Sequence, residues 1–179
     1  MSKVIIYGYS NLGSKIAKSL KNSEFEIIIV DYDEDNYNKA ILDGYNTFNK
    51  DLLEDEELIE IGIESNVKAF YCVSDSSNNN FFVTLSARNL NKKIRIISKA
   101  SSKSDSKKML LAGATKVINP YEIGALRMFR LLDKPIISHV LDKILFGDSL
   151  LNIEEFPILK GSYLDGKYLQ DFHISRDFN

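Results

Sequence analysis

The residues of this chain whose types and spacing best suit ligand chemistry lie in one short turn near the N-terminus. The turn Gly8-Tyr9-Ser10-Asn11-Leu12-Gly13 follows the apolar stretch Val4–Tyr7, which has the composition of a buried strand. It resembles the dinucleotide-binding pattern G-x-G-x-x-G, with serine at the middle glycine position. Eighteen positions after Gly13, at the end of a second apolar stretch, stands Asp31. A phosphate-binding turn followed by an acid at the next strand end is typical of a site that holds a nucleotide by its phosphate and its ribose.

Each residue type in this turn has a chemical reason to be there. Gly8 permits the sharp exit from the strand, and Gly13 lets the following helix pack closely on it. The backbone amides after Gly8, at the positive end of the helix dipole, favour a bound anion. Ser10 either narrows the space for a pyrophosphate or donates its hydroxyl to a phosphate oxygen. The charge of Asp31 repels a 2′-phosphate and so disfavours NADP. The alternative to a nucleotide site is a Rossmann-like sheet whose crevice is vacant.

Further polar side chains stand where other predicted strands end. Asp51 follows the third strand-like stretch, Ser74 and Asp75 follow the fourth, and Lys99 follows the fifth. Ligands of open α/β sheets bind outside the carboxyl ends of the strands, so these four residues are expected along the same edge as the turn. Lys99 either offsets phosphate charge or is an ordinary solvated surface lysine, and the sequence does not separate the two.

The elements that must position these side chains alternate regularly. Strands, several of them continuously apolar, are predicted at Val4–Tyr7, Phe25–Val30, Asn46–Phe48, Ala69–Val73, Ile94–Ser98 and Lys116–Ile118. Helices are predicted between them at Leu12–Leu20, Asn36–Leu42, Leu53–Ile61, Asn80–Leu90 and Ser104–Ala112. The acids Glu54–Glu57 suit a first helical turn and are interpreted as capping and a solvated face, not as a metal site. This order predicts the α/β class, with a Rossmann-like, doubly wound parallel sheet of about six strands.

The composition of the 179 residues limits what the protein can be. The apolar fraction of 44% supplies one good core, and the formal charge of −2 gives no electrostatic case for nucleic acid or for a strongly anionic membrane surface. No apolar stretch is long enough to cross a bilayer, so no membrane insertion of this chain is expected. The single Cys72 is expected to be a buried strand residue, not a reactive thiol. These features together predict a cytoplasmic α/β domain.

The tail beyond the sixth predicted strand has a different pattern. Helices are predicted over Tyr121–Leu132 and Ile136–Phe146, interrupted at Pro135, and they pack either against another subunit or on the domain's own sheet. Leu150–Phe156 has the pattern of a strand, and loop character follows it. The predicted organisation is a nucleotide-binding domain at 1–120, crossover or dimerisation helices at 121–148, and the incomplete start of a second lobe at 149–179.

Residues suited to catalysis are few. His139 and His173 lie far from any predicted strand end and have no Cys, Asp or Glu partner at metal-ligand spacing. No nucleophile motif is visible, and little chain follows the sixth strand for a separate substrate domain. A ligand site without evident chemistry is expected, so the protein is predicted not to be an enzyme. A small NAD-dependent oxidoreductase is the alternative, and an oligomerisation module with an empty crevice is a further one.

Several segments together resemble one known family. The segment from Ala112 to Pro120, followed by Ile123-Gly124, is similar to a glycine-alanine to valine-isoleucine-x-proline signature. Gly8-Tyr9-Ser10 resembles the glycine-x-serine opening of many channel-attached members, and Lys50-Asp51 stands where members have glycine-aspartate, with only the aspartate matching. The remaining similar segments are Cys72 to Asn80 with Ser86-Ala87-Arg88, the basic-ended strand Ile94–Lys99, and Phe156–Leu169. The family is the regulator-of-potassium-conductance domain, RCK, also called KTN or TrkA-N.

The resemblance implies a cytoplasmic ligand-sensing domain that gates a potassium channel or a potassium uptake system. Such domains form homodimers through the helices after the sixth strand, and the dimers assemble into rings that act on a membrane pore. The implied ligand is NAD(H) or an adenine nucleotide (AMP, ADP or ATP). Calcium-activated members carry acids after the fifth strand, where this chain has Lys99-Ala100-Ser101, so no metal site is expected. Carried over by position, the ligand-binding residues are Gly8, Tyr9, Ser10, Asn11, Leu12, Gly13, Asp31, Asp51, Ser74, Asp75 and Lys99.

Overall fold

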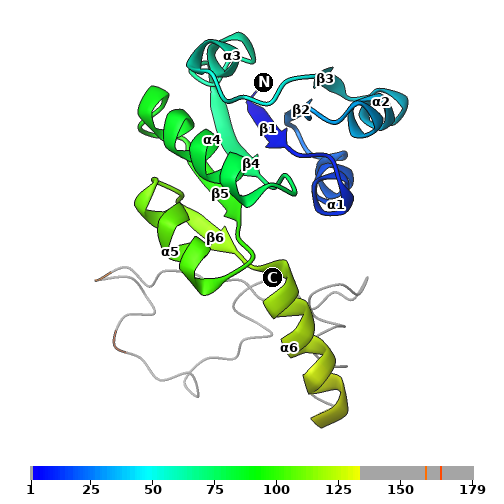
Figure 1. The fold of residues 1–179 in the computed structure, drawn as a ribbon, viewed down its shortest axis with the longest axis vertical. Helices are drawn as coiled ribbons and strands as arrows, with labels where there is room; N and C mark the ends of the chain where they lie inside the picture. The colour runs from blue at the N-terminus through cyan, green and yellow to red at the C-terminus, as the bar shows by residue number, and fades with distance from the viewer. Residues whose placement is uncertain (1, 134–159, 161–165, 167–179) are drawn as a thin grey trace. The chain divides into compact units, whose positions relative to one another are not determined.

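The computed structural model describes residues 2–133, together with Lys160 and Gly166 (Figure 1). The chain divides into two units, Met1–Met128 and Phe129–Asn179, and the first holds the sheet. The elements in chain order are β1 (Lys3–Tyr7), α1 (Asn11–Leu20), β2 (Glu26–Val30), α2 (Glu34–Leu42), β3 (Asn46–Phe48), α3 (Asp55–Glu60), β4 (Val67–Cys72), α4 (Ser77–Leu90), β5 (Arg95–Lys99), α5 (Lys103–Leu111), β6 (Lys116–Ile118) and α6 (Pro120–Asp133). The predicted alternation of strand and helix is therefore confirmed.

The six strands form one sheet in the order β3-β2-β1-β4-β5-β6, and every neighbouring pair is parallel. At the centre, Tyr7 of β1 is level with Val30 of β2 on one side and with Cys72 of β4 on the other. The chain builds outward from β1 to β3, crosses back to β4, and then builds outward in the opposite direction to β6. The direction reverses between β1 and β4, which is where open α/β sheets bind their ligands. The Rossmann-like, doubly wound fold class is confirmed.

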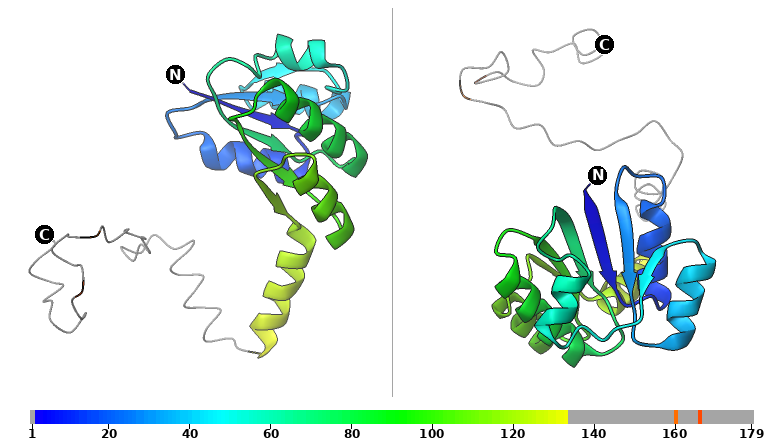
Figure 2. Two further views of the ribbon diagram at one scale, coloured as in Figure 1. Left: turned by 90° about the vertical axis from the view of Figure 1, so that its left-hand side faces the viewer. Right: turned by 90° about the horizontal axis from the view of Figure 1, so that it is seen from above.

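Two layers of helices enclose the central strands (Figure 2). Ile6 of β1 packs in one buried cluster with Ala17 of α1 and Ala40 of α2. Its neighbour Ile5 faces the opposite side of the sheet, where it joins a cluster that includes Leu58 of α3 and residues of α4. Successive residues of β1 face opposite sides of the sheet, and both sides are buried by helices. This explains why the sequence of the strand is continuously apolar, which is the pattern that predicted it.

Several helices begin earlier than their apolar periodicity predicted, because polar side chains cap their first turns. The side chains of three residues each accept a hydrogen bond from a backbone amide three positions on, at 3.0 to 3.2 Å. These caps are Asp33 on α2, Ser76 on α4 and Ser102 on α5. A capping side chain satisfies an amide that has no partner within the helix, so the helix can begin in a polar segment.

The glycine of the Ala112–Pro120 signature has a structural explanation. Gly113 has φ +102°, and a Cβ on it would lie 2.4 Å from Cγ of Arg88. The Arg88 guanidinium donates to the carbonyl of Gly113 at 2.9 Å and to the Thr115 hydroxyl at 3.2 Å. It also donates to the carbonyls of Asn91 and Lys92, at 3.1 and 2.9 Å. One side chain of α4 thus joins the end of its own helix to the turn between α5 and β6.

The tail predictions are only partly covered by the structure. The predicted helix Tyr121–Leu132 is confirmed as α6. The predicted helix Ile136–Phe146, the strand Leu150–Phe156 and the lobe at 149–179 lie outside the described residues, as do His139 and His173. In the part of the chain that is described, no helix combines the length and the apolar character needed to span a bilayer.

Candidate functional site

Two glycines fix the path of the turn after β1. Gly8 has φ +99°, and a Cβ on it would lie 2.4 Å from the Cα of Ser74. A Cβ on Gly13 would lie 1.8 Å from the carbonyl oxygen of Gly8. These distances leave no space for a side chain, so both predicted roles, the sharp exit and the close helix packing, are seen in the structure.

The first turn of α1 presents unpaired backbone amides at the switch point, the place between β1 and β4 where the strand order reverses. Ser10 is the N-cap of this helix, and its side chain accepts no hydrogen bond from the first-turn amides. Within residues 2–133, the amides of Asn11 and Leu12 have no protein acceptor. The first turn carries no acidic side chain that would compete for the positive end of the helix dipole. Amides arranged in this way attract an anion such as a phosphate.

These amides open onto a pocket of about 420 Å³, called here the phosphate pocket. Its lining residues are Ser10, Asn11, Leu12, Lys15, Asp75, Lys99, Pro120 and Tyr121. Five of them are residues predicted from the sequence. The other three, Lys15, Pro120 and Tyr121, were not predicted. The signal for Lys15 was present, because it stands four residues after Asn11 and therefore on the same side of the helix.

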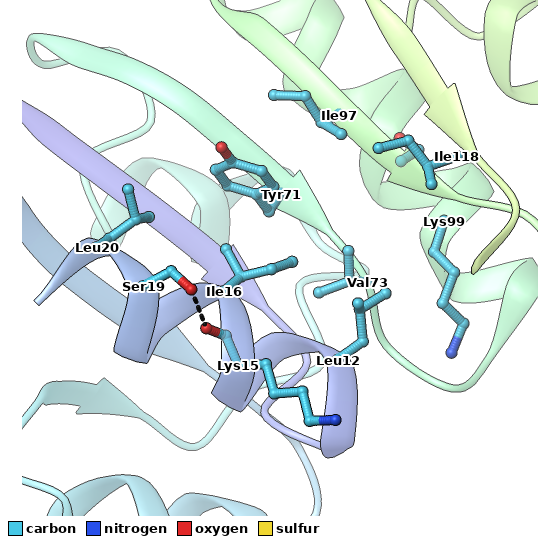
Figure 3. Close-up of a pocket in the computed structure, with 11 residues that line it drawn as sticks. Leu12, Lys15, Ile16, Ser19, Leu20, Tyr71, Val73, Ile97, Lys99 and Ile118 are labelled. Carbon is cyan, nitrogen blue, oxygen red and sulfur yellow. Dashed lines mark hydrogen bonds between the residues drawn. The ribbon is translucent and has the colours of Figure 1, made fainter. Parts of the chain in front are cut away.

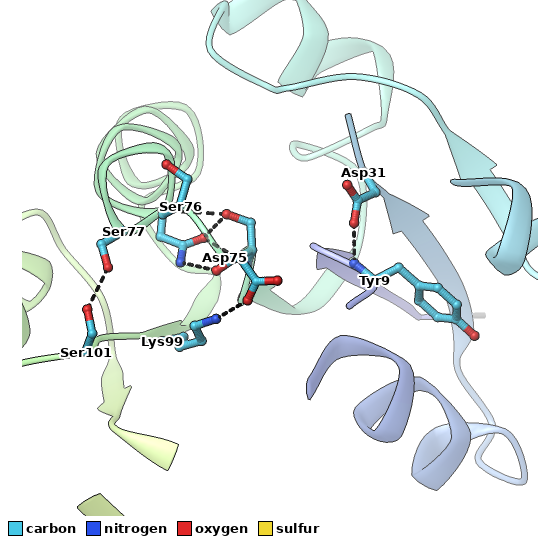
Figure 4. Close-up of polar contacts among 9 residues, drawn as sticks. Tyr9, Asp31, Asp75, Ser76, Ser77, Lys99 and Ser101 are labelled. Atoms are coloured by element: carbon cyan, nitrogen blue, oxygen red, sulfur yellow. Dashed lines mark hydrogen bonds and ion pairs between the residues drawn. The ribbon is translucent and has the colours of Figure 1, made fainter. Parts of the chain in front are cut away.

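An ion pair lies at one side of the phosphate pocket (Figure 4). Lys99 Nζ is 2.6 Å from Asp75 Oδ1, and the side chain of Lys99 is only 7% exposed whereas that of Asp75 is 67% exposed. The hydrogen bond and the charge of the Lys99 ammonium, with a smaller contribution from the Ser10 hydroxyl, lower the pKa of Asp75, and burial acts in the opposite direction. The solvated surface lysine is therefore ruled out for Lys99, whose charge is held at the site where an anion would bind.

Asp31 holds the turn through a hydrogen bond from the backbone amide of Tyr9 (Figure 4). It is 3% exposed, and its Oδ2 accepts the amide of Tyr9 at 2.6 Å while its Oδ1 accepts the amide of Asp33 at 2.9 Å. Burial raises the pKa of this carboxyl, although the two amide hydrogen bonds act in the opposite direction. Each carboxylate oxygen can accept a second hydrogen bond, but Asp31 is not among the residues that line the phosphate pocket.

Ser74 stabilises the loop that carries Asp75. Its side chain is buried and its hydroxyl donates to Asn80 Oδ1 at 2.9 Å. Asn80 in turn donates from Nδ2 to the Ser74 carbonyl, also at 2.9 Å, and accepts the Ser74 amide at 3.0 Å. This closed set of bonds shapes the loop that carries Asp75 toward the phosphate pocket. Ser74 is therefore not among the residues that line the pocket.

Asp51 also lies outside the phosphate pocket, at the carboxyl end of β3. It accepts the amide of Leu53 at 3.2 Å and faces Glu57, whose pKa is raised first by burial and then by the charge of Asp51. Lys50 Nζ is 2.9 Å from Glu60 and 3.9 Å from Glu57. Asp55, Glu56 and Glu57 occupy the first turn of α3, as predicted, but the side chain of the N-cap residue Glu54 makes no capping hydrogen bond, so the capping interpretation was wrong. Glu57 is half-buried, so the solvated-face interpretation does not hold for that residue.

A second hollow, called here the α1 groove, runs from the phosphate pocket along α1 (Figure 3). It has a volume of about 370 Å³ and a mainly apolar floor, which includes Tyr71 of β4, Val73 just after β4, Ile97 of β5 and Ile118 of β6. Lys15 and Lys99 lie together at one end of it. Parallel sheets are usually covered on both faces, so this apolar floor is a surface on which further protein is expected to pack.

No cluster of three or more His, Cys, Asp or Glu side chains suited to a metal ion occurs in the described part of the chain. The lone Cys72 is buried, as predicted, and burial raises the pKa of its thiol to about 12. The polar atoms that converge at the switch point are therefore amides, hydroxyls, ammonium groups and single carboxylates. Such a set can bind and orient an anionic, hydroxyl-bearing ligand.

Comparison with solved structures supports the fold assignment. The structure is similar to the GsuK channel bound to NAD, with a TM-score of 0.67 at 21% identity over 78% of this chain and 25% of that one. It is also similar to the AMP-bound form of the Kef CTD of Shewanella denitrificans, with a TM-score of 0.64 at 17% identity over 79% of this chain and 87% of that one. At these identities the likeness shows a shared fold.

Comparison of sequences gives the family. Potassium channel protein 1 of Methanocaldococcus jannaschii is 31% identical over 172 residues, an alignment that covers 95% of this chain and 51% of the relative. The chain thus spans about half the length of that channel protein. The sequence profile of the TrkA-N domain matches residues 4–120, which is most of the chain. The protein therefore belongs to the TrkA-N family, the family of RCK domains.

Proposed function

We propose that this protein is a regulatory domain of a potassium channel or potassium uptake system and that it binds a nucleotide at the carboxyl ends of β1, β4 and β5. The observation that carries the proposal is the phosphate pocket, in which unpaired amides of α1 lie beside the ammonium groups of Lys15 and Lys99. A phosphate is the ligand that this setting attracts most strongly. The potassium channel relative and the TrkA-N family support the regulatory role.

The ligand proposed for this pocket is NAD(H) or an adenine nucleotide. The phosphate would bind the amides of Asn11 and Leu12, and the ribose hydroxyls would donate to Asp31. A 2′-phosphate would lie against that carboxylate, so NADP should bind more weakly than NAD. The carboxylate of Asp75 stands beside the same pocket, and its pairing with Lys99 offsets the repulsion that a phosphate would otherwise meet. The GsuK and Kef structures, which hold NAD and AMP, support this class of ligand.

The regulatory mechanism we propose requires two copies of the chain. Apolar side chains of α6 such as Tyr121, Ile123 and Met128 are more than half exposed, and the α1 groove is open, so both surfaces suit a second copy. A nucleotide shifts the arrangement of such a pair only by binding one arrangement more tightly than another. Paired copies in a ring would pass that shift to a pore at the cytoplasmic face of the membrane. The nucleotide would act as a signal and leave chemically unchanged.

Calorimetry with NAD, NADH, AMP, ADP, ATP and NADP tests the proposal. We expect at least one of the first five to bind, and NADP to bind more weakly than NAD. Asp31→Ala should weaken NAD by about tenfold or more, because hydrogen bonds to a charged group contribute about 1.5–3 kcal/mol. Asp35→Ala, which removes a charge from the exposed first turn of α2, is the matched control and should bind as the wild type does.

Three outcomes would contradict the proposal. If none of the nucleotides binds, the nucleotide site is wrong while the fold stands. Equal affinity of wild type and a folded Asp31→Ala variant, checked by thermal unfolding, removes the ribose role of Asp31. Turnover of NADH by the protein would replace the sensing role with an oxidoreductase.

A further inference from the structure

Tyr9 lies in the middle of the phosphate-binding turn, but its side chain points away from the phosphate pocket (Figure 4). The residue is fully buried and packs in the apolar cluster between the sheet and helices α1 and α2. Its ring meets the ring of Tyr45 edge to face, with the centroids 5.8 Å apart. Its hydroxyl donates to Asp43 Oδ2 at 2.7 Å. The hydroxyl is thus a buried group whose partner is supplied by a distant part of the chain.

The same residue is held at its backbone. The amide of Tyr9 donates to Asp31 Oδ2 at 2.6 Å, so Tyr9 is fixed at both ends, to Asp31 through the main chain and to Asp43 through the side chain. Asp43 is the C-cap residue of α2 and also lies 3.7 Å from Lys18 of α1. The hydrogen bond from Tyr9 is the main reason that the pKa of Asp43 is lowered, so the Asp43 carboxylate is charged when it accepts this bond.

This attachment matters because the turn contains a glycine and has no capping side-chain bond. Gly8 precedes Tyr9 with φ +99°, and the side chain of Ser10 accepts no hydrogen bond from the first turn of α1. A glycine-containing segment has many conformations available, and a ligand that selects one of them loses affinity to the entropy of ordering. A fastened Tyr9 removes that cost before binding. It also reserves the Tyr9 amide for Asp31, so a phosphate finds its amides from Asn11 onward.

We propose that Tyr9 is the positioning residue of the nucleotide site, holding the turn and the Asp31 carboxylate in their binding geometry through its hydrogen bond to Asp43. This inference rests on the proposed nucleotide-binding function. It assigns to Tyr9 a role without ligand contact, whereas the family resemblance implied that Tyr9 is a ligand-binding residue. Asp43 lies in the α2–β3 connection and lines neither the phosphate pocket nor the α1 groove, but it holds Tyr9 in place and so has a positioning role as well.

The test separates the contribution of the Tyr9 hydroxyl from that of the packing of its ring. Tyr9→Phe keeps the packing and removes the bond, Asp43→Ala removes the acceptor, and Asp43→Asn keeps an acceptor oxygen while losing the charge. We expect Tyr9→Phe and Asp43→Ala each to weaken nucleotide binding about fivefold, since one hydrogen bond contributes about 1 kcal/mol. The double variant should be no weaker than either single one, and Asp43→Asn should recover most of the affinity.

A readout that needs no ligand accompanies the titrations. Hydrogen exchange of the Tyr9 amide, followed by NMR, should become about fivefold faster in Tyr9→Phe, while exchange in the core of β1 stays the same. Tyr37→Phe, which removes a hydroxyl from α2 outside this set of bonds, is the control and should change neither readout.

The outcomes distinguish the two proposals. If the wild type binds no nucleotide, the proposed function fails, and the exchange rates alone show whether the Tyr9 anchor fixes the turn. If the wild type binds and Tyr9→Phe matches it in affinity and in amide exchange, the positioning role is overturned while the nucleotide site stands. If Asp43→Asn loses as much affinity as Asp43→Ala, the positioning role is also overturned. The affinity would then depend on the charge of Asp43 and not on its hydrogen bond from the Tyr9 hydroxyl.

Discussion

At the scale of single residues, the Asp31 carboxylate accepts hydrogen bonds from the amides of Tyr9 and Asp33 while it is buried at the switch point. Burial raises its pKa above the ordinary value of 3.8. The ionised form, which would accept ribose hydroxyls in the proposed site, is therefore lost at a higher pH than it would be for a solvated aspartate. In the proposed site, ligand binding would thus be coupled to pH through one side chain.

We expect the affinity for NAD to fall on acidification, beginning above pH 3.8. The sign follows because the ionised carboxylate offers only acceptors, whereas protonation turns one acceptor position into a donor. Titrations from about pH 7 down to about pH 4 would measure the effect, and Asp31→Ala would report the contribution of the ligand's own groups. An identical slope in the two proteins would contradict this role for Asp31.

What the sequence predicts at this scale depends on how local the cause is. The roles of Gly8 and Gly13 follow from steric limits within a few residues, and both are confirmed. The burial of Lys99 and the fastening of Tyr9 depend on Asp75 and Asp43, which are 24 and 34 positions away. Their positions at strand ends predicted a shared edge for Asp75 and Lys99 but not their ion pair, and nothing in the local sequence marks Asp43 as the partner of Tyr9. The turn was therefore predictable, whereas the contacts that hold and charge it were not.

At the scale of elements, the close approach of α1 to β1 depends on Gly13. We expect Gly13→Ala to destabilise the protein by more than about 2 kcal/mol, because its Cβ would lie 1.8 Å from a backbone oxygen that cannot move aside cheaply. Gly124→Ala in α6 is the matched control, because nothing lies within 4 Å of its Cβ position. The control should leave the unfolding midpoint of the sheet domain unchanged or slightly raised. Equal effects in denaturant unfolding would refute the steric argument.

The guanidinium of Arg88 provides a second test of how elements are joined. Arg88→Lys should cost about 2–4 kcal/mol, since a single ammonium cannot reproduce a fork that reaches Gly113, Thr115 and the end of α4. Lys93→Ala, which removes an exposed charge from the nearby loop, should have little effect in the same urea titration. A lysine variant as stable as the wild type would show that the bonds of Arg88 are replaceable.

Element order was predictable because both faces of the central strands are buried and their apolar stretches stand out. Element ends were less predictable. β4 begins at Val67, two residues before its predicted start, and β5 ends at Lys99, one residue after its predicted end. Strand limits are set by hydrogen bonds to neighbouring strands, and the position of a neighbour is not contained in the local pattern.

At the scale of the whole molecule, α6 carries apolar side chains that are exposed within the described residues, among them Met128. Met128 is 75% exposed, so its substitution should not disturb the sheet domain. We expect Met128→Asp to convert a dimer to a monomer in size-exclusion chromatography with light scattering. Leu42→Asp, at an 88% exposed position on α2, is the control and should remain dimeric. A monomeric wild type, or a dimeric Met128→Asp variant, would contradict pairing through α6.

The burial of Cys72 gives this chain a useful property for such measurements. It is the single cysteine of the sequence, it lies in the centre of the sheet, and burial raises the pKa of its thiol to about 12. The thiolate is the nucleophile that attacks a maleimide, so the folded protein should leave the buried Cys72 thiol unlabelled. A cysteine introduced at Leu42 or Met128 would then carry a spin label or fluorophore alone, without removal of the native thiol. Distances between such labels in paired copies could be followed as nucleotide is added, and any labelling of Cys72 itself would report unfolding.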